Sequence, residues 1–187
     1  MSQDLRIKLP TWVDDVVDWE RRYRDDESRM RLAIAIASEN VRRSTGGPFG
    51  AVIVEEDTGR LVSVGMNRVV PERNSILHAE IIAFMMAQAR LGTYTLGAPE
   101  LPPHTLVCTC DPCAMCLGAT LWSGVRRVVC GATRDDAERV RFDEGPVFPE
   151  SYRYLADKGI TFVHGVLRAE ACAVLETYAA SGEIYNG

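Results

Sequence analysis

Alternation of strand-like and helix-like segments after residue 50 limits the fold more than any other feature of the chain. The run "AVIVEEDTGRLVSVG" holds two β-rich stretches around Asp57-Thr58-Gly59, which predicts a β-hairpin. Strands are also predicted at 105–110, 126–132 and 160–165, and helices at 79–92, 112–124, 134–142, 149–158 and 168–180. Such alternation favours a mixed central sheet with helices on both faces, so we expect an α/β fold, a three-layer α/β/α sandwich.

The chain is expected to form a single domain over residues 1–187, because this length suits one hydrophobic core. Two amphipathic helices are predicted near its start, over 11–24 and 27–43, with Asp26 as the N-cap of the second. We therefore assign an N-terminal helical extension to 1–26 and a C-terminal tail to about 165–187.

The charge balance argues against nucleic acid as a partner. The net charge is −5 and the basic residues are dispersed among acidic ones, so no broad basic surface is expected. No apolar run approaches the roughly 20 residues that span a bilayer, which argues against a membrane protein. The start "MSQDLRIKLP" lacks the apolar centre of a signal peptide, so a cytoplasmic location is expected.

A close cysteine pair, Cys113 and Cys116 in "PCAMC", suits a disulfide, a redox switch, a structural zinc site or a catalytic zinc site. Upstream stands "HAE", in which Glu80 follows two residues after His78. Together the two segments match the H-x-E…P-C-x-x-C signature of zinc-dependent deaminases. The combination therefore favours catalytic zinc over the other three possibilities.

The chemistry of a catalytic zinc explains these residue types. Cys113 and Cys116 are expected on the first turn of a helix, where the positive end of the helix dipole favours the thiolates that bind metal. His78 supplies a third ligand, and three protein ligands leave the fourth position open for a water. Glu80 then lies close enough to take a proton from that water and to deliver it to a leaving amino group.

Less specific interpretations remain for each residue alone. A structural four-cysteine zinc site would need a second pair, and strand alternation points Cys108 and Cys110 to one face that we expect to be core. A thioredoxin-like redox pair would need a βαβ pattern near the N-terminus, which is missing. Cys108, Cys110, Cys130 and Cys172 are predicted to be small buried hydrophobic residues, and His104 and His164 have no cluster around them.

From "GGPFG" to the tail, the chain resembles the bacterial guanine deaminases of the cytidine deaminase superfamily. The matching segments are "GGPFGAVIV", "NRVV", "HAEIIA", "PCAMCLGA", "LWSGVRRVV", "FDEGP" and "IYN". "HAE" and "PCAMC" are common to the whole superfamily, whereas "FDEGP" and the tail favour the guanine branch. The resemblance implies a cytidine deaminase-like fold, a Zn²⁺ cofactor, a small purine base as substrate and a homodimer.

The resemblance also implies roles for individual residues. Phe49 is expected to stack on the base, Asn67 to hydrogen-bond its edge, and Glu144 to act as a second carboxylate in substrate binding and proton transfer. The other residues expected to contact substrate are Ala79 through its backbone, Trp122, Asp143 and Tyr185. Tyr185 lies on a tail that, in these enzymes, closes the active site of a partner subunit by domain swapping.

Three positions depart from the pattern of the family. Asp111 stands before Pro-Cys where the family usually has Glu, and this shorter carboxylate is expected to alter a contact or a loop near the metal. Arg141 stands before "FDEGP" where related chains commonly have Gly, and Cys110 replaces a residue that is usually small. None of the three replaces a metal ligand or Glu80.

The expected function is therefore zinc-dependent hydrolysis of guanine to xanthine and ammonia. The expected mechanism is attack by an activated water, a tetrahedral intermediate, and proton transfer by Glu80 with help from Glu144. Alternative substrates are an aminotriazine, cytosine, cytidine or guanosine. A tRNA adenosine deaminase shares "HAE" and the cysteine pair, and a non-catalytic protein with structural zinc is the alternative from another class.

Overall fold

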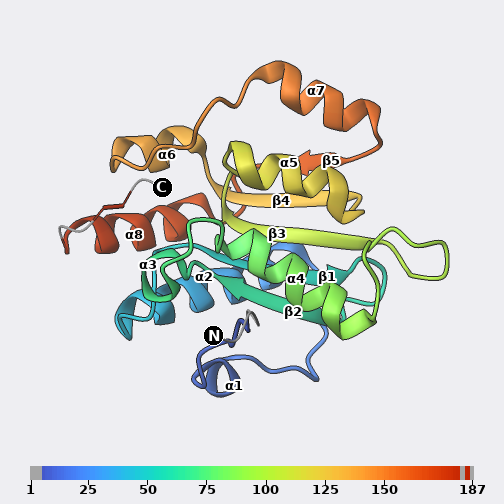
Figure 1. Cartoon of the computed structure of the whole chain (residues 1–187), viewed down its shortest axis with the longest axis horizontal. Coiled ribbons are helices and arrows are strands. Elements are labelled where there is room, and N and C mark those ends of the chain that lie inside the picture. The colour runs from blue at the N-terminus through green and yellow to red at the C-terminus, as the bar shows by residue number, and fades with distance from the viewer. Residues whose placement is uncertain (1–5, 182–183, 186–187) are drawn as a thin grey trace, which may run out of the picture.

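The computed structural model describes residues 6–181 and 184–185, and its centre is a five-stranded sheet in the order β2-β1-β3-β4-β5 (Figure 1). The strands are β1 (Gly50–Glu55), β2 (Leu61–Met66), β3 (His104–Cys110), β4 (Arg127–Ala132) and β5 (Thr161–Val163). Strand β1 is antiparallel to β2 and β3, whereas β3, β4 and β5 are mutually parallel. The predicted mixed sheet is confirmed.

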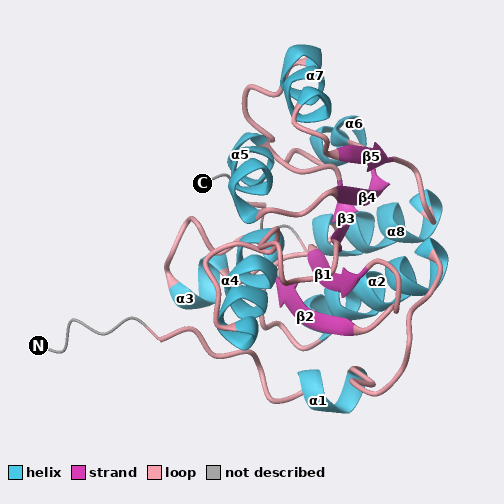
Figure 2. Ribbon diagram, turned by 90° about the vertical axis from the view of Figure 1, so that its right-hand side faces the viewer, coloured by secondary structure: helices cyan, strands magenta, loops and turns pink. Residues whose placement is uncertain are grey.

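Helices cover both faces of this sheet (Figure 2). One face carries α2 (Asp26–Arg42) and α8 (Arg168–Ala179), and the other carries α4 (Ala79–Leu91), α5 (Ala114–Ser123) and α7 (Pro149–Asp157). The shorter helices are α1 (Val13–Val16), α3 (Val69–Glu72) and α6 (Arg134–Arg139). The three layers confirm the α/β/α sandwich that the alternation of elements predicts.

Residues of β1 alternate between two hydrophobic clusters. Val52 and Val54 pack in the cluster that includes Met30 of α2, whereas Ile53 packs in the one that includes Ala83 of α4. All of these side chains are fully buried. Because helices cover both faces of the strand, its sequence is almost continuously apolar.

A close approach between β2 and α4 places the start of that helix. A side chain at Gly65 would put its Cβ 2.0 Å from the carbonyl oxygen of Ala79, so only glycine fits there. The first turn of α4 therefore lies directly against the sheet. This contact fixes the position of His78 and Glu80, the two residues that flank Ala79.

The predicted helix over 11–24 is wrong, because α1 covers only Val13–Val16. The carboxylate of Asp18 accepts hydrogen bonds from the backbone N–H groups two and three residues further on, which favours a turn over a helix. Tyr23 then donates its N–H to the carbonyl of Gly59 at 2.8 Å. The second half of the segment is therefore extended chain that joins the hairpin turn.

The N-cap of α2 differs by one residue from the prediction. Asp25, rather than Asp26, accepts the N–H of Ser28 at 2.7 Å. Asp26 instead receives two hydrogen bonds from the guanidinium of Arg127, at 2.7 and 2.6 Å.

Within the described residues, no helix combines the length and the apolar character that crossing a membrane requires.

Candidate active site

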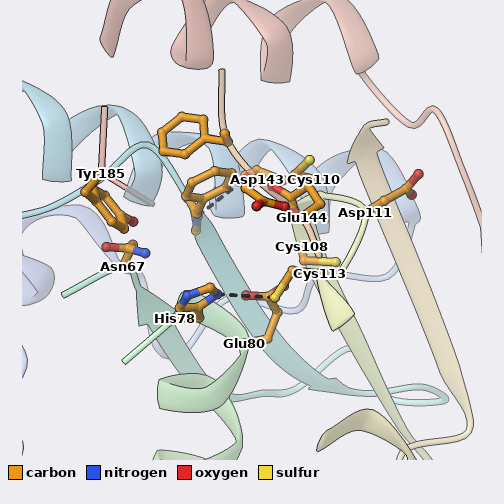
Figure 3. Close-up of a pocket in the computed structure, with 14 residues that line it drawn as sticks. Asn67, His78, Glu80, Cys108, Cys110, Asp111, Cys113, Asp143, Glu144 and Tyr185 are labelled. Atoms are coloured by element: carbon orange, nitrogen blue, oxygen red, sulfur yellow. Dashed lines mark hydrogen bonds between the residues drawn. The ribbon is translucent and has the colours of Figure 1, made fainter. Parts of the chain in front are cut away.

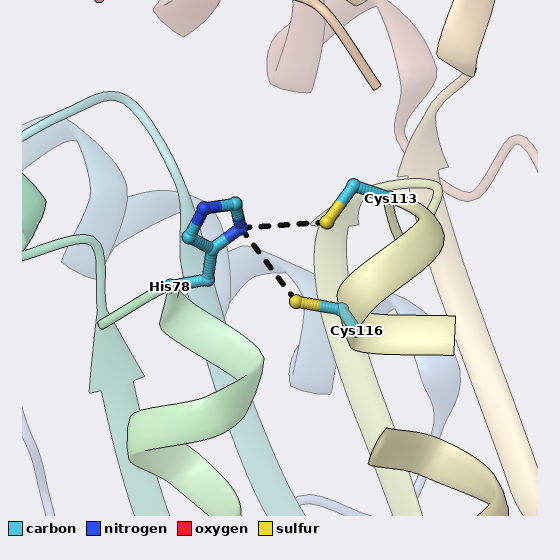
Figure 4. A group of neighbouring side chains, drawn as sticks. All are labelled: His78, Cys113 and Cys116. Carbon is cyan, nitrogen blue, oxygen red and sulfur yellow. Dashed lines mark hydrogen bonds between the residues drawn. The ribbon is translucent and has the colours of Figure 1, made fainter. Parts of the chain in front are cut away.

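His78, Cys113 and Cys116 converge where α4 and α5 begin (Figure 4). His78 is the N-cap of α4, Cys113 is the N-cap of α5, and Cys116 lies in the first turn of α5. The Nδ1 atom of His78 lies 3.5 Å from Cys113 Sγ and 3.7 Å from Cys116 Sγ. Zinc bonds of ordinary length at a tetrahedral angle separate N and S ligands by about 3.6 Å, so the three side chains fit one zinc ion.

The two thiols differ in their protonation. The hydrogen bond with Cys116 and, after it, the hydrogen bond with His78 outweigh burial and lower the pKa of Cys113 to about 4. The pKa of Cys116 is raised well above its ordinary value, first by its hydrogen bond to Cys113 and then by burial. Cys113 is therefore the more acidic of the two thiols, and coordination of a metal by both sulfurs would release the proton of Cys116.

Two buried carboxyl groups face the same pocket (Figure 3). Glu80 is 8% exposed and Glu144 is 7% exposed. Burial and then the negative charge of Cys113 raise the pKa of Glu80 to about 7 and that of Glu144 to about 8. Both groups can therefore hold a proton near neutral pH, which general acid–base catalysis requires.

The loop that carries Glu144 is tied to the helix that carries the cysteines. The N–H of Ala114 donates to the carbonyl oxygen of Glu144 at 3.0 Å. Gly145 has a φ of 67°, and its N–H donates to the carboxylate of Asp143 at 2.8 Å. Asp143 itself is exposed and lines the pocket, so its side chain shapes the loop as well as the rim of the pocket.

Three aromatic side chains form one wall of the pocket. The ring of Phe142 packs edge-on against Phe49, with centroids 4.9 Å apart, and against Tyr185, with centroids 5.9 Å apart. Phe49, Phe142 and Tyr185 all line the pocket. Flat apolar surfaces of this kind suit a planar heterocyclic base.

Asn67 lies beside Tyr185 at the pocket and is 1% exposed (Figure 3). Its side-chain oxygen accepts the N–H of Val69 at 3.2 Å, which fixes the orientation of the amide. A Cβ on Gly47 would lie 2.9 Å from the hydroxyl of Tyr185 and 3.1 Å from the side-chain oxygen of Asn67. The three residues are therefore closely packed beside the pocket.

Tyr185 lines the pocket of its own chain in the single chain described, and the expected exchange of tails between subunits stays a prediction. Burial raises the pKa of its hydroxyl well above the ordinary value. Of the predicted tail, residues 182–183 and 186–187 lie outside the described part of the chain.

Two of the residues predicted to contact substrate, Trp122 and Ala79, are not among those that line the pocket. Trp122 is 79% exposed and is not among the residues that line the pocket, so the expectation that it lines the pocket is not met in this chain. Helix α5 buries Cys116, Thr120 and Ser123, and the helical repeat therefore turns Trp122 to the outside. Ala79 is 1% exposed between His78 and Glu80, and its side chain packs in the core, so the expected contact through its backbone stays a prediction.

Several pocket residues were not assigned from the sequence. Phe142 is the first residue of the "FDEGP" segment from which Glu144 was assigned, so the same motif could have indicated Phe142 as a pocket residue. Cys108 and Cys110 are buried as predicted, at 2% and 4% exposure, but both also line the pocket. Cys172, predicted to be buried, is only partly covered.

His164 is not isolated, contrary to the sequence-based expectation. Its Nδ1 lies 2.7 Å from one carboxylate oxygen of Asp111, and the other oxygen accepts the N–H of Arg134 at 3.3 Å. Asp111 lies two residues before Cys113 at the end of β3. The carboxylate that departs from the family pattern therefore joins the cysteine-bearing turn to the segments that follow β4 and β5.

A His-Cys-Cys metal site beside a buried glutamate, at the helix starts of an α/β/α sandwich, defines a zinc-dependent deaminase. Comparison with known families agrees. The model of the cytidine and deoxycytidylate deaminase zinc-binding region matches residues 23–132, and the chain belongs to this family.

Guanine deaminases are among the relatives of the chain. The chain is 34% identical to guanine deaminase of Bacillus subtilis over 136 residues. This matched region covers 73% of this chain and 83% of the relative. The solved structure of guanine deaminase from Nitrosomonas europaea has a TM-score of 0.91 and 43% identity, covering 96% of this chain and 98% of that one. A structure of NE0047 in complex with 2,6-diaminopurine has a TM-score of 0.93 and 43% identity, covering 100% of this chain and 98% of that one.

Proposed function

We propose that the protein hydrolyses guanine to xanthine and ammonia. The observation that carries this proposal is the second buried acid, Glu144, which faces the same pocket as Glu80. Guanine carries its amino group on an amidine-like carbon, and its hydrolysis requires protons both at a ring nitrogen and at the leaving amine. Two carboxyl groups with raised pKa values suit these two requirements.

The residues of the pocket divide the work in this proposal. Phe49 and Phe142 pack against the flat ring of the base, and the amide of Asn67 hydrogen-bonds its edge. Glu80 takes a proton from the attacking water and delivers it to the leaving amine, while Glu144 holds the proton for the ring nitrogen. One water is consumed: its oxygen bonds to the ring carbon and becomes the carbonyl oxygen of xanthine, the carbon–nitrogen bond breaks, and ammonia leaves. One proton of the water reaches the amine through Glu80, and the other replaces the proton that Glu144 gave to the ring nitrogen.

Zinc is the cofactor, held by His78, Cys113 and Cys116. When bound, zinc supplies a Lewis acid that lowers the pKa of a water molecule. Glu80 is not among these ligands, and its burial beside them positions it for proton transfer rather than for coordination.

A substrate panel tests the proposal. Zinc-loaded protein is given guanine, guanosine, cytosine, cytidine, adenine and an aminotriazine, and released ammonia is measured. We expect turnover of guanine above all others. Inert guanine together with turnover of a pyrimidine or a nucleoside would refute the proposed substrate. Salt-sensitive binding of tRNA would favour a tRNA deaminase, which the net charge of −5 argues against.

We also propose that the protein is a homodimer. Large apolar side chains are exposed on three helices of one face of the sheet, with Met85 on α4, Trp122 on α5 and Tyr154 on α7 (Figure 2). Exposed apolar surface of this kind favours association between copies. Trp122→Glu should convert the dimer to a monomer in light scattering, and a wild-type monomer would refute the proposal.

The thiolate ligands support a reducing location. The cysteines are free thiols, and the metal site uses two of them, so we propose that the enzyme acts in the cytoplasm. Fractionation of cells that produce the protein tests this, and recovery outside the cytoplasm would contradict it.

A further inference from the structure

Asn40, a fully buried residue of α2, has no role in the chemistry described above. Its amide nitrogen donates to the carbonyl oxygens of Gly47 and Asn67, both at 2.9 Å. Its side-chain oxygen accepts the hydroxyl of Thr45 at 2.8 Å. Both donors and an acceptor of this one side chain are therefore used, and two of its partners lie beside the substrate pocket.

The two segments that Asn40 connects both supply the pocket. Asn67 donates its backbone N–H to the carbonyl of Phe49 at 3.0 Å, and both residues line the pocket. A Cβ on Gly46 would lie 1.9 Å from the carbonyl oxygen of Asn67 and 2.7 Å from the amide nitrogen of Asn40. The backbones of 46–49 and Asn67 therefore meet without room for a side chain, and Asn40 bridges them.

The N-terminal extension continues this hydrogen-bond chain. Trp12 is 4% exposed, and its indole N–H donates to the hydroxyl of Thr45 at 3.1 Å. That hydroxyl donates in turn to Asn40, so an unbroken series of bonds runs from Trp12 to the carbonyl of Asn67. Trp12 precedes residues 23–132, the part of the chain that the family model matches.

We propose that Asn40 is a positioning residue for base recognition and that the N-terminal extension holds it through Trp12 and Thr45. Loss of the bridge leaves the carbonyl oxygens of Gly47 and Asn67 without a buried donor, so the segments move apart. The Asn67 amide then no longer meets the edge of the base. The inference rests on the proposed function only in taking Asn67 as a contact of the substrate.

Thr45 offers an isosteric test. Thr45→Val removes the hydroxyl and keeps the shape, whereas Thr45→Ser keeps the hydroxyl. We expect Thr45→Val to raise KM for guanine about tenfold, because small displacements of positioning groups cost factors of this size and more. Thr45→Ser should restore KM, and kcat and zinc content should change less than twofold in both. Asn40→Asp, which replaces the donating nitrogen with an acceptor, should raise KM further.

The matched control is Thr177→Val, which removes a hydroxyl that donates to the carbonyl of Ala173 at 2.7 Å on α8. It should leave KM unchanged. A fall in melting temperature in Thr45→Val and Asn40→Asp with unchanged KM would show a purely structural role and overturn the proposal.

Amide hydrogen exchange gives a second readout that does not depend on the substrate. Exchange of the peptides that contain 46–49 and Asn67 should accelerate in Thr45→Val and in Trp12→Phe but not in Thr177→Val. Unchanged exchange would overturn the positioning role. Wild-type protein that does not convert guanine would refute the proposed function alone, because the exchange experiment would still decide the role of Asn40.

Discussion

Replacement of Glu80 by Gln tests the assignment of the catalytic acid–base group. The side chain is 8% exposed, and Gln has nearly the same shape, so packing is kept while the group can no longer take up a proton. One transfer by a positioned group contributes roughly 10²-fold or more to the rate, and Glu80 serves two transfers, so we expect kcat to fall about 10⁴-fold. This corresponds to about 5 kcal/mol of barrier.

The assay combines ammonia release with metal analysis. Glu80 is not one of the residues that form the metal site, so the Glu80→Gln protein should bind zinc as the wild type does, and its KM should stay within a few-fold of the wild-type value. Loss of zinc and turnover together would show that Glu80 supports the metal rather than the chemistry. Retention of more than about a tenth of kcat would refute the acid–base role, since even one lost transfer costs more.

Three further predictions concern residues around the site. His164→Ala should speed release of zinc to a chelator by less than the roughly tenfold that loss of a direct partner of a ligand costs, because His164 contacts Asp111, which lies two residues before the ligand Cys113. Unchanged release would show that the contact with Asp111 does not support the metal site. Arg141 has a φ of 76°, so Arg141→Gly should raise the free energy of unfolding by about 1 kcal/mol in urea titrations. Destabilisation would show that the contacts of the Arg141 side chain outweigh its backbone strain. Removal of residues 181–187 should lower turnover far more than the melting temperature, because Tyr185 lines the pocket, and full turnover by the shortened chain would exclude Tyr185 from the site.

Most helices and strands could be predicted from the sequence because the residues that begin and end them lie within the same short segment. Gly92 and Gly124 end α4 and α5 with φ values of 66° and 87°, as expected of glycines at helix ends. The helix predicted over 11–24 failed for the opposite reason. Its apolar spacing suits a helix, but Asp18 forms a turn and Tyr23 bonds to Gly59. Gly59 lies 36 positions after Tyr23, and the spacing of apolar residues within one segment cannot predict a contact over that distance.

The same distinction holds in the site. His78, Cys113 and Cys116 were assigned from spacing within two short segments, and the structure brings the three together. The contact between Asp111 and His164 joins residues that are 53 positions apart, and no spacing rule indicates it. Trp122 was assigned by resemblance, but the buried face of α5 turns its side chain outward.

The residues that line the pocket come from more of the chain than the metal ligands do. His78 and Cys113 begin helices that pack on the sheet, and both lie within 23–132, the region that the family model matches. Glu144 and Tyr185 lie beyond it, on a loop and on the tail. Substitutions in these later segments can therefore change the shape of the pocket without moving a zinc ligand. The region that the family model matches, which ends at residue 132, includes the metal ligands together with Phe49 and Asn67, whereas Glu144 and Tyr185, two further residues expected to contact the base, follow it.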